Sequence, residues 1–168
     1  MSLDDFAADE QADHPVAVAR WSRLARAVLE AEGIVSDTEV SLLFVDEATI
    51  ASLNERFLDK PGPTDVLSFP IEDEADRSGR SPDEGGTGPG SIEPDTGRLL
   101  LLGDVVICPA VAARNAVYHE VSLDDELALL VVHGILHLLG MDHQVDEEAD
   151  RMERREQQLL DRFYRVAL

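Results

Sequence analysis

Hydrophobic positions along the chain follow two spacings, one typical of helices and one typical of strands. Spacing and end signals predict helices over residues 16–31, 47–57, 109–118, 123–139 and 146–164. Short apolar runs predict strands over 40–45, 66–70 and 99–108, where Gly103 indicates a bulge. The pattern therefore predicts a chain that mixes helices and strands, without an internal repeat.

Polar residues mark the starts of two of these helices. Asp46 is placed to cap the helix over 47–57, in which Ile50, Leu53 and Phe57 share one face. We expect this face to lie against the rest of the protein.

The helix over 123–139 is apolar on nearly every side. Ser122 and Asp125 have the spacing of a capping box at its start. Because a helix without a polar face has to be covered by other elements, we expect it to be the central buried helix.

Residues 72–98 interrupt the pattern. They are rich in glycine, proline and acids, and Ile92 is their one large apolar side chain. Such a segment cannot bury enough apolar surface to fold by itself, and it is too long for an ordinary connection. We therefore expect a single domain over residues 1–168 that carries a mobile insertion at 72–98 between two strands.

Composition narrows the class of protein. A chain of 168 residues with 44% hydrophobic positions suits one domain with one core. The single cysteine rules out an internal disulfide and favours a reducing compartment. The acidic N-terminus lacks the features of a signal peptide, and no apolar run is long enough to span a bilayer. We expect a cytoplasmic protein without a membrane partner.

Three of the five histidines fall in the stretch HGILHLLGMDH, residues 133–143. His133 and His137 are four residues apart, so their rings share one face of a helix. Gly140 is the residue type that ends a helix in a left-handed conformation, after which the chain turns back. His143 can then approach the other two rings.

Three imidazoles that converge in an apolar setting favour a metal ion. Neutral rings would leave unsatisfied nitrogens at roughly 1–3 kcal/mol each, and protonated rings would gather positive charge in a low dielectric. Imidazole suits Zn²⁺, and three protein ligands leave a fourth position open, as in catalytic sites. The sequence predicts one divalent ion per chain at His133, His137 and His143, with nickel, cobalt or iron as alternatives to zinc. We expect His14 and His119 to be solvated.

The spacing H-x3-H-x2-G-x2-H is also that of the metzincin peptidases. Those enzymes carry a glutamate directly after the first histidine, where it acts as the general base. Here that position is Gly134, so this helix turn provides no carboxylate to accept a proton. The sequence therefore identifies no catalytic base.

The full motif H-G-x-L-H-L-x-G-x-D-H resembles that of the YbeY family of metal-dependent endoribonucleases, also called rRNA maturation factors. Four further segments look like segments of that family and occur in its order: LNERF (53–57), PTDVLSFP (63–70), LGDVVIC (102–108) and ADRMERREQQLL (149–160). The resemblance covers most of the chain except the N-terminus and the acidic insertion.

The resemblance implies an α+β fold, in which a small mixed β-sheet packs with about five helices. It implies a zinc site on the central helix and the following turn. The implied activity is cleavage of single-stranded RNA, in 16S rRNA 3′-end maturation and ribosome quality control. The implied partners are single-stranded RNA or an rRNA precursor and the ribosome or ribosomal proteins, and not DNA.

One position departs from the family pattern. The family typically has an arginine directly after the aromatic residue of its LN segment, and this arginine is assigned to catalysis. Here Leu58 follows Phe57, and Arg56 precedes it, turned by about 100° around the helix. Arg56 could replace the missing arginine only where the helix end frays, so the role is not carried over.

Several polar residues near the motif have two interpretations. Asp142, beside His143, is a candidate to orient a ligand ring or to cap the turn. Asp65 and Ser68 lie three apart on a strand, so at most one of them should face the metal. Cys108 could complete a closed structural zinc site, but the end of a buried strand is where a small hydrophobic residue is expected.

A net charge of −21 argues against binding nucleic acid through bulk electrostatics. An enzyme that acts on RNA would have to gather its arginines locally. Two sets, on the first and last predicted helices, are candidates to line a groove: Arg20, Arg23, Arg26, Arg151, Arg154, Arg155 and Arg162. The alternative is that they pair with the acids around them.

Two other functions compete with the endoribonuclease. One is a zinc hydrolase of another substrate class, such as a peptide or a small amide, against which the missing glutamate counts. The other is a non-catalytic zinc-stabilised ribosome assembly factor, since an acidic surface suits basic ribosomal proteins.

Overall fold

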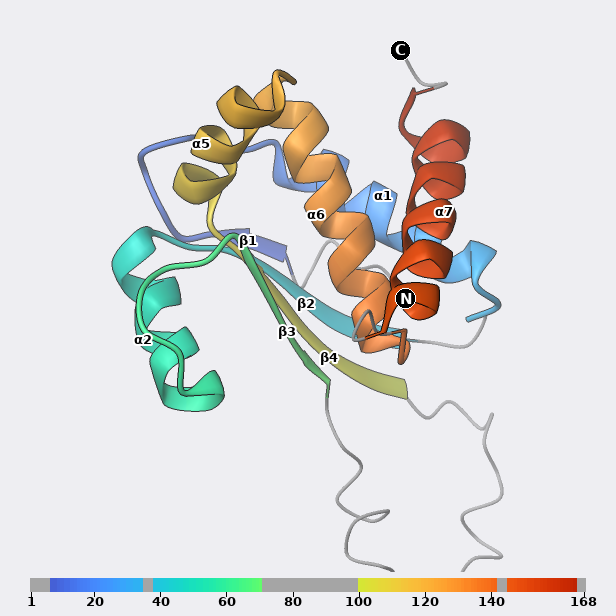
Figure 1. Cartoon of the computed structure of the whole chain (residues 1–168), viewed down its shortest axis with the longest axis horizontal. Coiled ribbons are helices and arrows are strands. Elements are labelled where there is room, and N and C mark those ends of the chain that lie inside the picture. Colours follow the sequence, from blue (N-terminus) through green and yellow to red (C-terminus); the bar gives the residue numbers. More distant parts are fainter. Residues whose placement is uncertain (1–6, 35–37, 71–99, 142–144, 166–168) are drawn as a thin grey trace, which may run out of the picture.

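A computed structural model describes residues 7–34, 38–70, 100–141 and 145–165. In this part of the chain four strands form one sheet: β1 (Ala7–Asp9), β2 (Thr38–Phe44), β3 (Val66–Pro70) and β4 (Leu100–Ile107). The helices are α1 (Val18–Ala31), α2 (Glu47–Leu58), α5 (Pro109–His119), α6 (Leu123–Leu138) and α7 (Asp146–Phe163) (Figure 1). The predicted α+β class, with a small mixed sheet and about five helices, is confirmed.

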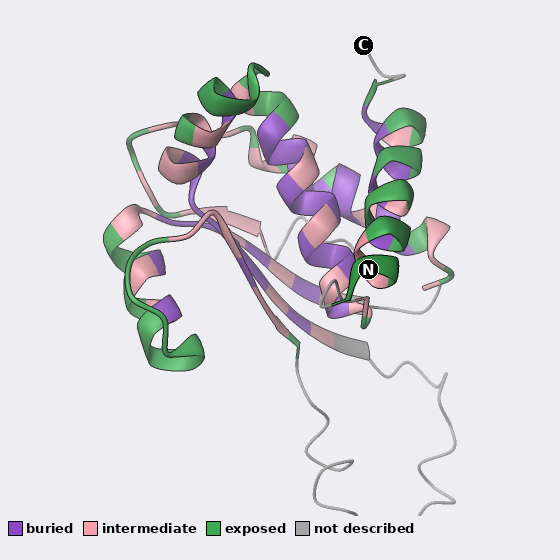
Figure 2. Cartoon of the chain, in the orientation of Figure 1, coloured by how far each residue is buried: buried purple, intermediate pink, exposed green. Residues whose placement is uncertain are grey.

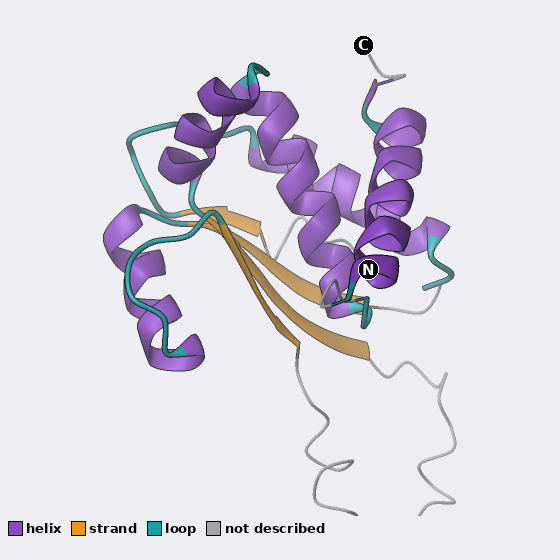
Figure 3. Cartoon of the chain, viewed as in Figure 1, coloured by secondary structure: helices purple, strands orange, loops and turns teal. Residues whose placement is uncertain are grey.

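The sheet has the order β1-β2-β4-β3 and contains both strand directions (Figure 3). β1, β2 and β4 run parallel to one another, whereas the edge strand β3 pairs antiparallel with β4. The register between β2 and β4 shifts by one residue at Gly103, whose φ of 137° is a conformation that favours glycine. The predicted bulge is confirmed. β1 was not predicted, because three residues are too few to show a period.

Alternate residues of β4 enter two different clusters, as expected for a strand covered on both faces. Val105 and Ile107 lie in the larger core beneath α1, α6 and α7. Val106, and Cys108 directly after the strand, lie in a smaller cluster with Ile50 of α2. Figure 1 shows the same arrangement, with α2 on one side of the sheet and the other three helices on the opposite side.

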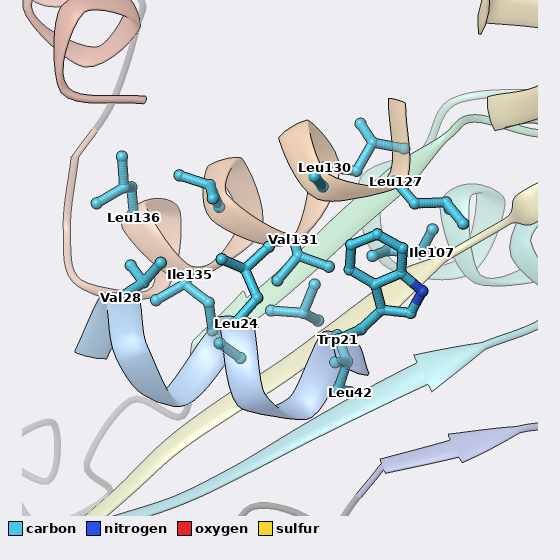
Figure 4. Packing of buried hydrophobic residues seen from close by; sticks show 14 of the residues in the cluster. Trp21, Leu24, Val28, Leu42, Ile107, Leu127, Leu130, Val131, Ile135 and Leu136 are labelled. Carbon is cyan, nitrogen blue, oxygen red and sulfur yellow. The ribbon is translucent and has the colours of Figure 1, made fainter. Parts of the chain in front are cut away.

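Helix α6 is the centre of the larger core, as its lack of a polar face predicted. Ten of its sixteen residues are buried, including residues on several sides of the helix (Figure 2). Leu127, Val131 and Ile135 lie between α6 and the Trp21–Val28 face of α1 (Figure 4). The start of α6 is fixed by the predicted capping box.

The predicted face of α2 is only half correct. The Asp46 side chain accepts a hydrogen bond from the Thr49 amide and caps the helix as expected. Ile50 is completely buried, but Phe57 is 59% exposed. The buried position one turn after Ile50 is instead Asn54, whose amide donates to the Gly62 carbonyl, so the following loop covers this end of the helix.

No helix in the described residues is long and apolar enough to cross a membrane. The acidic segment 72–98 lies outside the described residues. The strands on either side of it, β3 and β4, are antiparallel neighbours, in line with an insertion between two strands.

Candidate metal centre

His133 and His137 lie one turn apart near the C-terminal end of α6. Their ring centroids are 4.6 Å apart, with an angle of 74° between the ring planes. Both side chains are partly buried, on a helix whose other residues in this turn, Ile135 and Leu136, are fully buried. The structure therefore brings together two of the three predicted ligand rings on one face of the helix.

The third predicted ligand, His143, and the neighbouring Asp142 lie outside the described residues. The turn that leads to them starts as predicted, since Gly140 has a φ of 100°. The Gly140 amide donates to the His137 carbonyl, and the Met141 amide donates to the Leu136 carbonyl, which closes the end of α6. Within the described ranges no cluster of three histidine, cysteine or acidic side chains is placed to hold a metal.

Gly134 allows α6 to lie directly on the sheet. A methyl group at this position would be 2.6 Å from Cγ1 of Val105 and 3.4 Å from the Ser68 hydroxyl. The Ser68 hydroxyl donates a 3.1 Å hydrogen bond to the Gly134 carbonyl. The close packing of α6 on the sheet therefore explains Gly134, which stands where the peptidase pattern has a glutamate. Ser68 is the strand residue that faces the helix carrying His133 and His137.

Glu156 of α7 contacts the first histidine of the motif. Its Oε2 atom is 2.5 Å from Nδ1 of His133, and the residue is only 7% exposed. The sequence reasoning did not identify this residue. A signal was present, because Glu156 lies within the helical stripe of Met152, Leu159 and Leu160, all buried, where an acid needs a partner.

Asp65 and Cys108 have neighbours other than the two histidines. Asp65 accepts a 3.2 Å hydrogen bond from the Asn115 amide of α5. Cys108 is fully buried in the cluster under α2, and burial is the main cause that raises the pKa of its thiol. The expectation that Cys108 behaves as a small hydrophobic residue is supported, and the closed zinc site that would include it is not.

α2 is helical through Leu58, so Arg56 and Leu58 both lie in its last turn. The guanidinium of Arg56 lies over the ring of Phe57, 5.3 Å from its centre. Phe57 meets Phe69 of β3 edge-on at 5.5 Å. Arg56 and Phe57 are exposed beside the edge strand.

Arg20 and Arg155, which belong to the seven arginines named as groove candidates, contact acids. Arg20 is 2.9 Å from Asp124 of α6, and Arg155 is 2.6 Å from Glu32 at the end of α1. These contacts join α1 to α6 and to α7. For Arg20 and Arg155, they support the alternative that the arginines bind neighbouring acids and do not line a groove.

A second histidine–glutamate pair lies at the opposite end of α6. Nδ1 of His119, the last residue of α5, is 3.0 Å from Oε1 of Glu126, which is 3% exposed. His119 was expected to be solvated. Its side chain is 49% exposed, but its ring partners a buried carboxylate.

Asp125 links the same end of α6 to the end of α7. The Tyr164 hydroxyl donates a 2.8 Å hydrogen bond to Asp125 Oδ1. This bond is the main cause that lowers the pKa of Asp125, whereas burial and the bond raise the pKa of Tyr164 to about 12. The ring of Tyr164 also lies 6.2 Å from that of Trp21.

One family of known proteins matches most of this chain. The family described as Endoribonuclease YbeY matches residues 6–164. The Endoribonuclease YbeY of Acidothermus cellulolyticus is 51% identical over 76% of this chain and 71% of its own length. That of Beutenbergia cavernae is 44% identical over 88% of this chain and 91% of its own.

A solution structure of a Thermotoga maritima protein has a similar fold. The TM-score is 0.53 at 22% identity, over 92% of this chain and 88% of the other. At this level of identity the likeness shows the fold alone.

Proposed function

The chain belongs to the endoribonuclease YbeY family, and from this premise we propose that it cuts single-stranded RNA with a bound divalent metal. Membership of this family identifies the chain as a hydrolase that cleaves internal phosphodiester bonds of RNA in rRNA maturation. The proposal adds the metal, the preference for single strands, and a role in 16S rRNA 3′-end maturation and ribosome quality control.

We place one Zn²⁺ per chain at His133, His137 and His143. The observation that carries this assignment is the pair of adjacent rings at the end of α6, with ring centroids 4.6 Å apart. Two imidazoles on one helix face, one of them in contact with a buried carboxylate, have the donor chemistry that zinc takes in proteins. A third imidazole, three residues beyond Gly140, completes a set that leaves one position open.

A divalent ion in such a site supplies Lewis acidity, which offsets charge on the phosphate and lowers the pKa of water. The chain's own residues fix the backbone that carries the two histidines. Gly134 brings α6 onto the sheet, and the Ser68 hydroxyl fixes the Gly134 carbonyl, so the backbone between the two histidines is tied to β3. A rigid backbone at this point keeps both rings in one arrangement.

The substrate we propose is precursor rRNA, which places the enzyme in the cytoplasm and near the ribosome. With a net charge of −21 and arginines such as Arg20 and Arg155 already paired, phosphate binding has to be local and weak. We therefore expect RNA affinity to fall steeply with salt, as for any contact made mainly to phosphates.

A cleavage assay tests the proposal. Labelled single-stranded RNA and an rRNA precursor are incubated at low salt with wild type, with His133→Ala and with wild type plus chelator. His119→Ala is the matched control, because it removes a histidine that contacts a buried glutamate outside the motif. We expect wild type and His119→Ala to cut both RNAs, and the other two samples to leave them intact.

Three outcomes would contradict the proposal. Equal cleavage in all four samples would come from a contaminating nuclease. No cleavage of either RNA by wild type, together with binding to ribosomal proteins, would favour the non-catalytic assembly factor. Cleavage of a peptide or small amide instead would favour a zinc hydrolase of another substrate class.

A further inference from the structure

Glu156 is the one buried acid of α7 in the described residues, and it contacts a residue on another helix. Its Oε2 atom lies 2.5 Å from Nδ1 of His133, within hydrogen-bond distance. The two residues are 23 positions apart, so the contact depends on how α7 packs against α6. Burying a carboxylate is costly unless it is hydrogen-bonded, so the imidazole N–H has a clear role in keeping Glu156 there.

The chemistry of a carboxylate decides which ring nitrogen carries the proton. An ionised carboxylate only accepts hydrogen bonds, so its partner on the imidazole has to be N–H. A neutral histidine with its proton on Nδ1 keeps the lone pair on Nε2 available for a ligand. Outer carboxylates fix the orientation and basicity of metal-binding histidines in this way.

We propose that Glu156 is a positioning residue that holds His133 in its Nδ1–H form and leaves Nε2 to bind the metal. This inference rests on the proposed metal site, and it goes beyond it by giving α7 a part in the site. It also differs from the sequence prediction, in which Asp142 was the candidate for this task.

The chain contains its own control for this proposal. Glu126 is also buried and also contacts Nδ1 of a histidine, His119, at 3.0 Å. His119 lies at the other end of α6 and outside the histidine motif. Replacing Glu126 therefore disturbs the same kind of contact without touching the proposed metal ligands.

The experiment compares Glu156→Gln with Glu126→Gln in the full chain. A glutamine has the size of glutamate, but its amide both accepts and donates hydrogen bonds, so it no longer requires a proton on Nδ1 of its partner. Zn²⁺ affinity is measured by competition with a chelator for wild type, both variants and His133→Ala. The protonated nitrogen of His133 is read in the metal-free proteins from the imidazole ¹⁵N signals.

We expect Glu156→Gln to weaken Zn²⁺ binding by about 10–100-fold. We expect wild type to show the Nδ1–H form of His133, and Glu156→Gln to show a mixture of both forms. Glu126→Gln should bind Zn²⁺ as wild type does. A purely structural role for Glu156 would change the thermal midpoint and leave the affinity and the ¹⁵N signals unchanged.

The outcomes separate this inference from the proposed function. If wild type binds Zn²⁺, His133→Ala does not, and Glu156→Gln binds as tightly as wild type, the inference is wrong and the metal site stands. If wild type binds no Zn²⁺, the metal site and the inference fail together. If Glu156→Gln does not fold, the wild-type signals decide, since a proton on Nε2 of His133 would overturn the proposal.

Discussion

The two ends of α6 carry the same pair of residues in different surroundings. At the N-terminal end, His119 contacts the buried Glu126 at 3.0 Å. At the C-terminal end, His133 contacts the buried Glu156 at 2.5 Å. The second pair has another imidazole beside it, that of His137.

The difference teaches that a buried histidine–glutamate contact does not by itself make a site. At the N-terminal end the contact joins α5 to α6, beside a capping box and a tyrosine that also fix the helix. At the C-terminal end the contact joins α6 to α7 next to a glycine that holds the helix on the sheet. The contacts at the first end join helices, whereas the contact at the second end also reaches a ring that we propose to bind metal.

The largest effect should come from removing a ring at the second end. We expect His137→Ala to lose stoichiometric Zn²⁺ and RNA cleavage, because two remaining imidazoles hold zinc poorly. The loss should exceed the roughly 10–100-fold that follows removal of a ligand's hydrogen-bond partner. Metal analysis and the cleavage assay measure it. His119→Ala should keep both properties, and a full equivalent of metal in His137→Ala would refute the site.

Next in size is the effect of a methyl group at Gly134. Alanine is usually better than glycine in a helix by about 1 kcal/mol. Here its Cβ would lie 2.6 Å from Val105, a stiff buried side chain, so we expect net destabilisation within the roughly 1–3 kcal/mol typical of overpacking.

Denaturant unfolding of Gly134→Ala, Val105→Ala and the double variant measures this contact. The space left by Val105→Ala should accept the new methyl group, so the two changes should not add. A stabilised Gly134→Ala would show that the helix does not depend on this close approach.

A smaller loss of stability is expected from removing the Ser122 cap at the N-terminal end of α6. Ser122→Ala removes the hydroxyl that accepts from the Asp125 amide at 3.0 Å, which should cost about 1 kcal/mol of unfolding free energy. Ser122→Thr keeps the acceptor and serves as the control. Zn²⁺ affinity should be unchanged in both variants, and a parallel loss of affinity would mean that the two ends of α6 are not separable.

The smallest effect concerns pH at the same end. The pKa of Tyr164 rises from 10.0 to about 12 in the fold, so the folded state keeps a proton that the unfolded state releases. This contribution to stability is complete below pH 10 and is lost as the pH rises towards 12. The lowered pKa of Asp125 acts in the opposite range, and its contribution is lost as the pH falls below 3.8.

Unfolding experiments at several pH values test this linkage. Tyr164→Phe should lose less stability between pH 10 and 12 than wild type does. Tyr118→Phe is the matched control, because it removes a hydroxyl from a tyrosine that is 84% exposed. With one lysine and two tyrosines in the chain, few other side chains titrate in this window. If stability depended on pH in the same way in wild type and in Tyr164→Phe, the contact of the Tyr164 hydroxyl would not contribute to stability.

The sequence by itself determined the local features of this protein. Helix caps at Asp46 and Ser122, the bulge at Gly103 and the buried character of α6 follow from short-range spacing and backbone preferences, which act within a few residues. The spacing of His133 and His137 likewise fixes their shared face, because four residues make about one helical turn.

Only the tertiary structure decided which distant groups meet. Phe57 was expected on a buried face and is exposed, because the loop after α2 covers Asn54 instead. Glu156 contacts His133 because α7 packs on α6, and the period of a single helix cannot show which neighbour covers it. Packing between elements depends on the whole core, so the partners of buried charges follow from how the helices lie on the sheet.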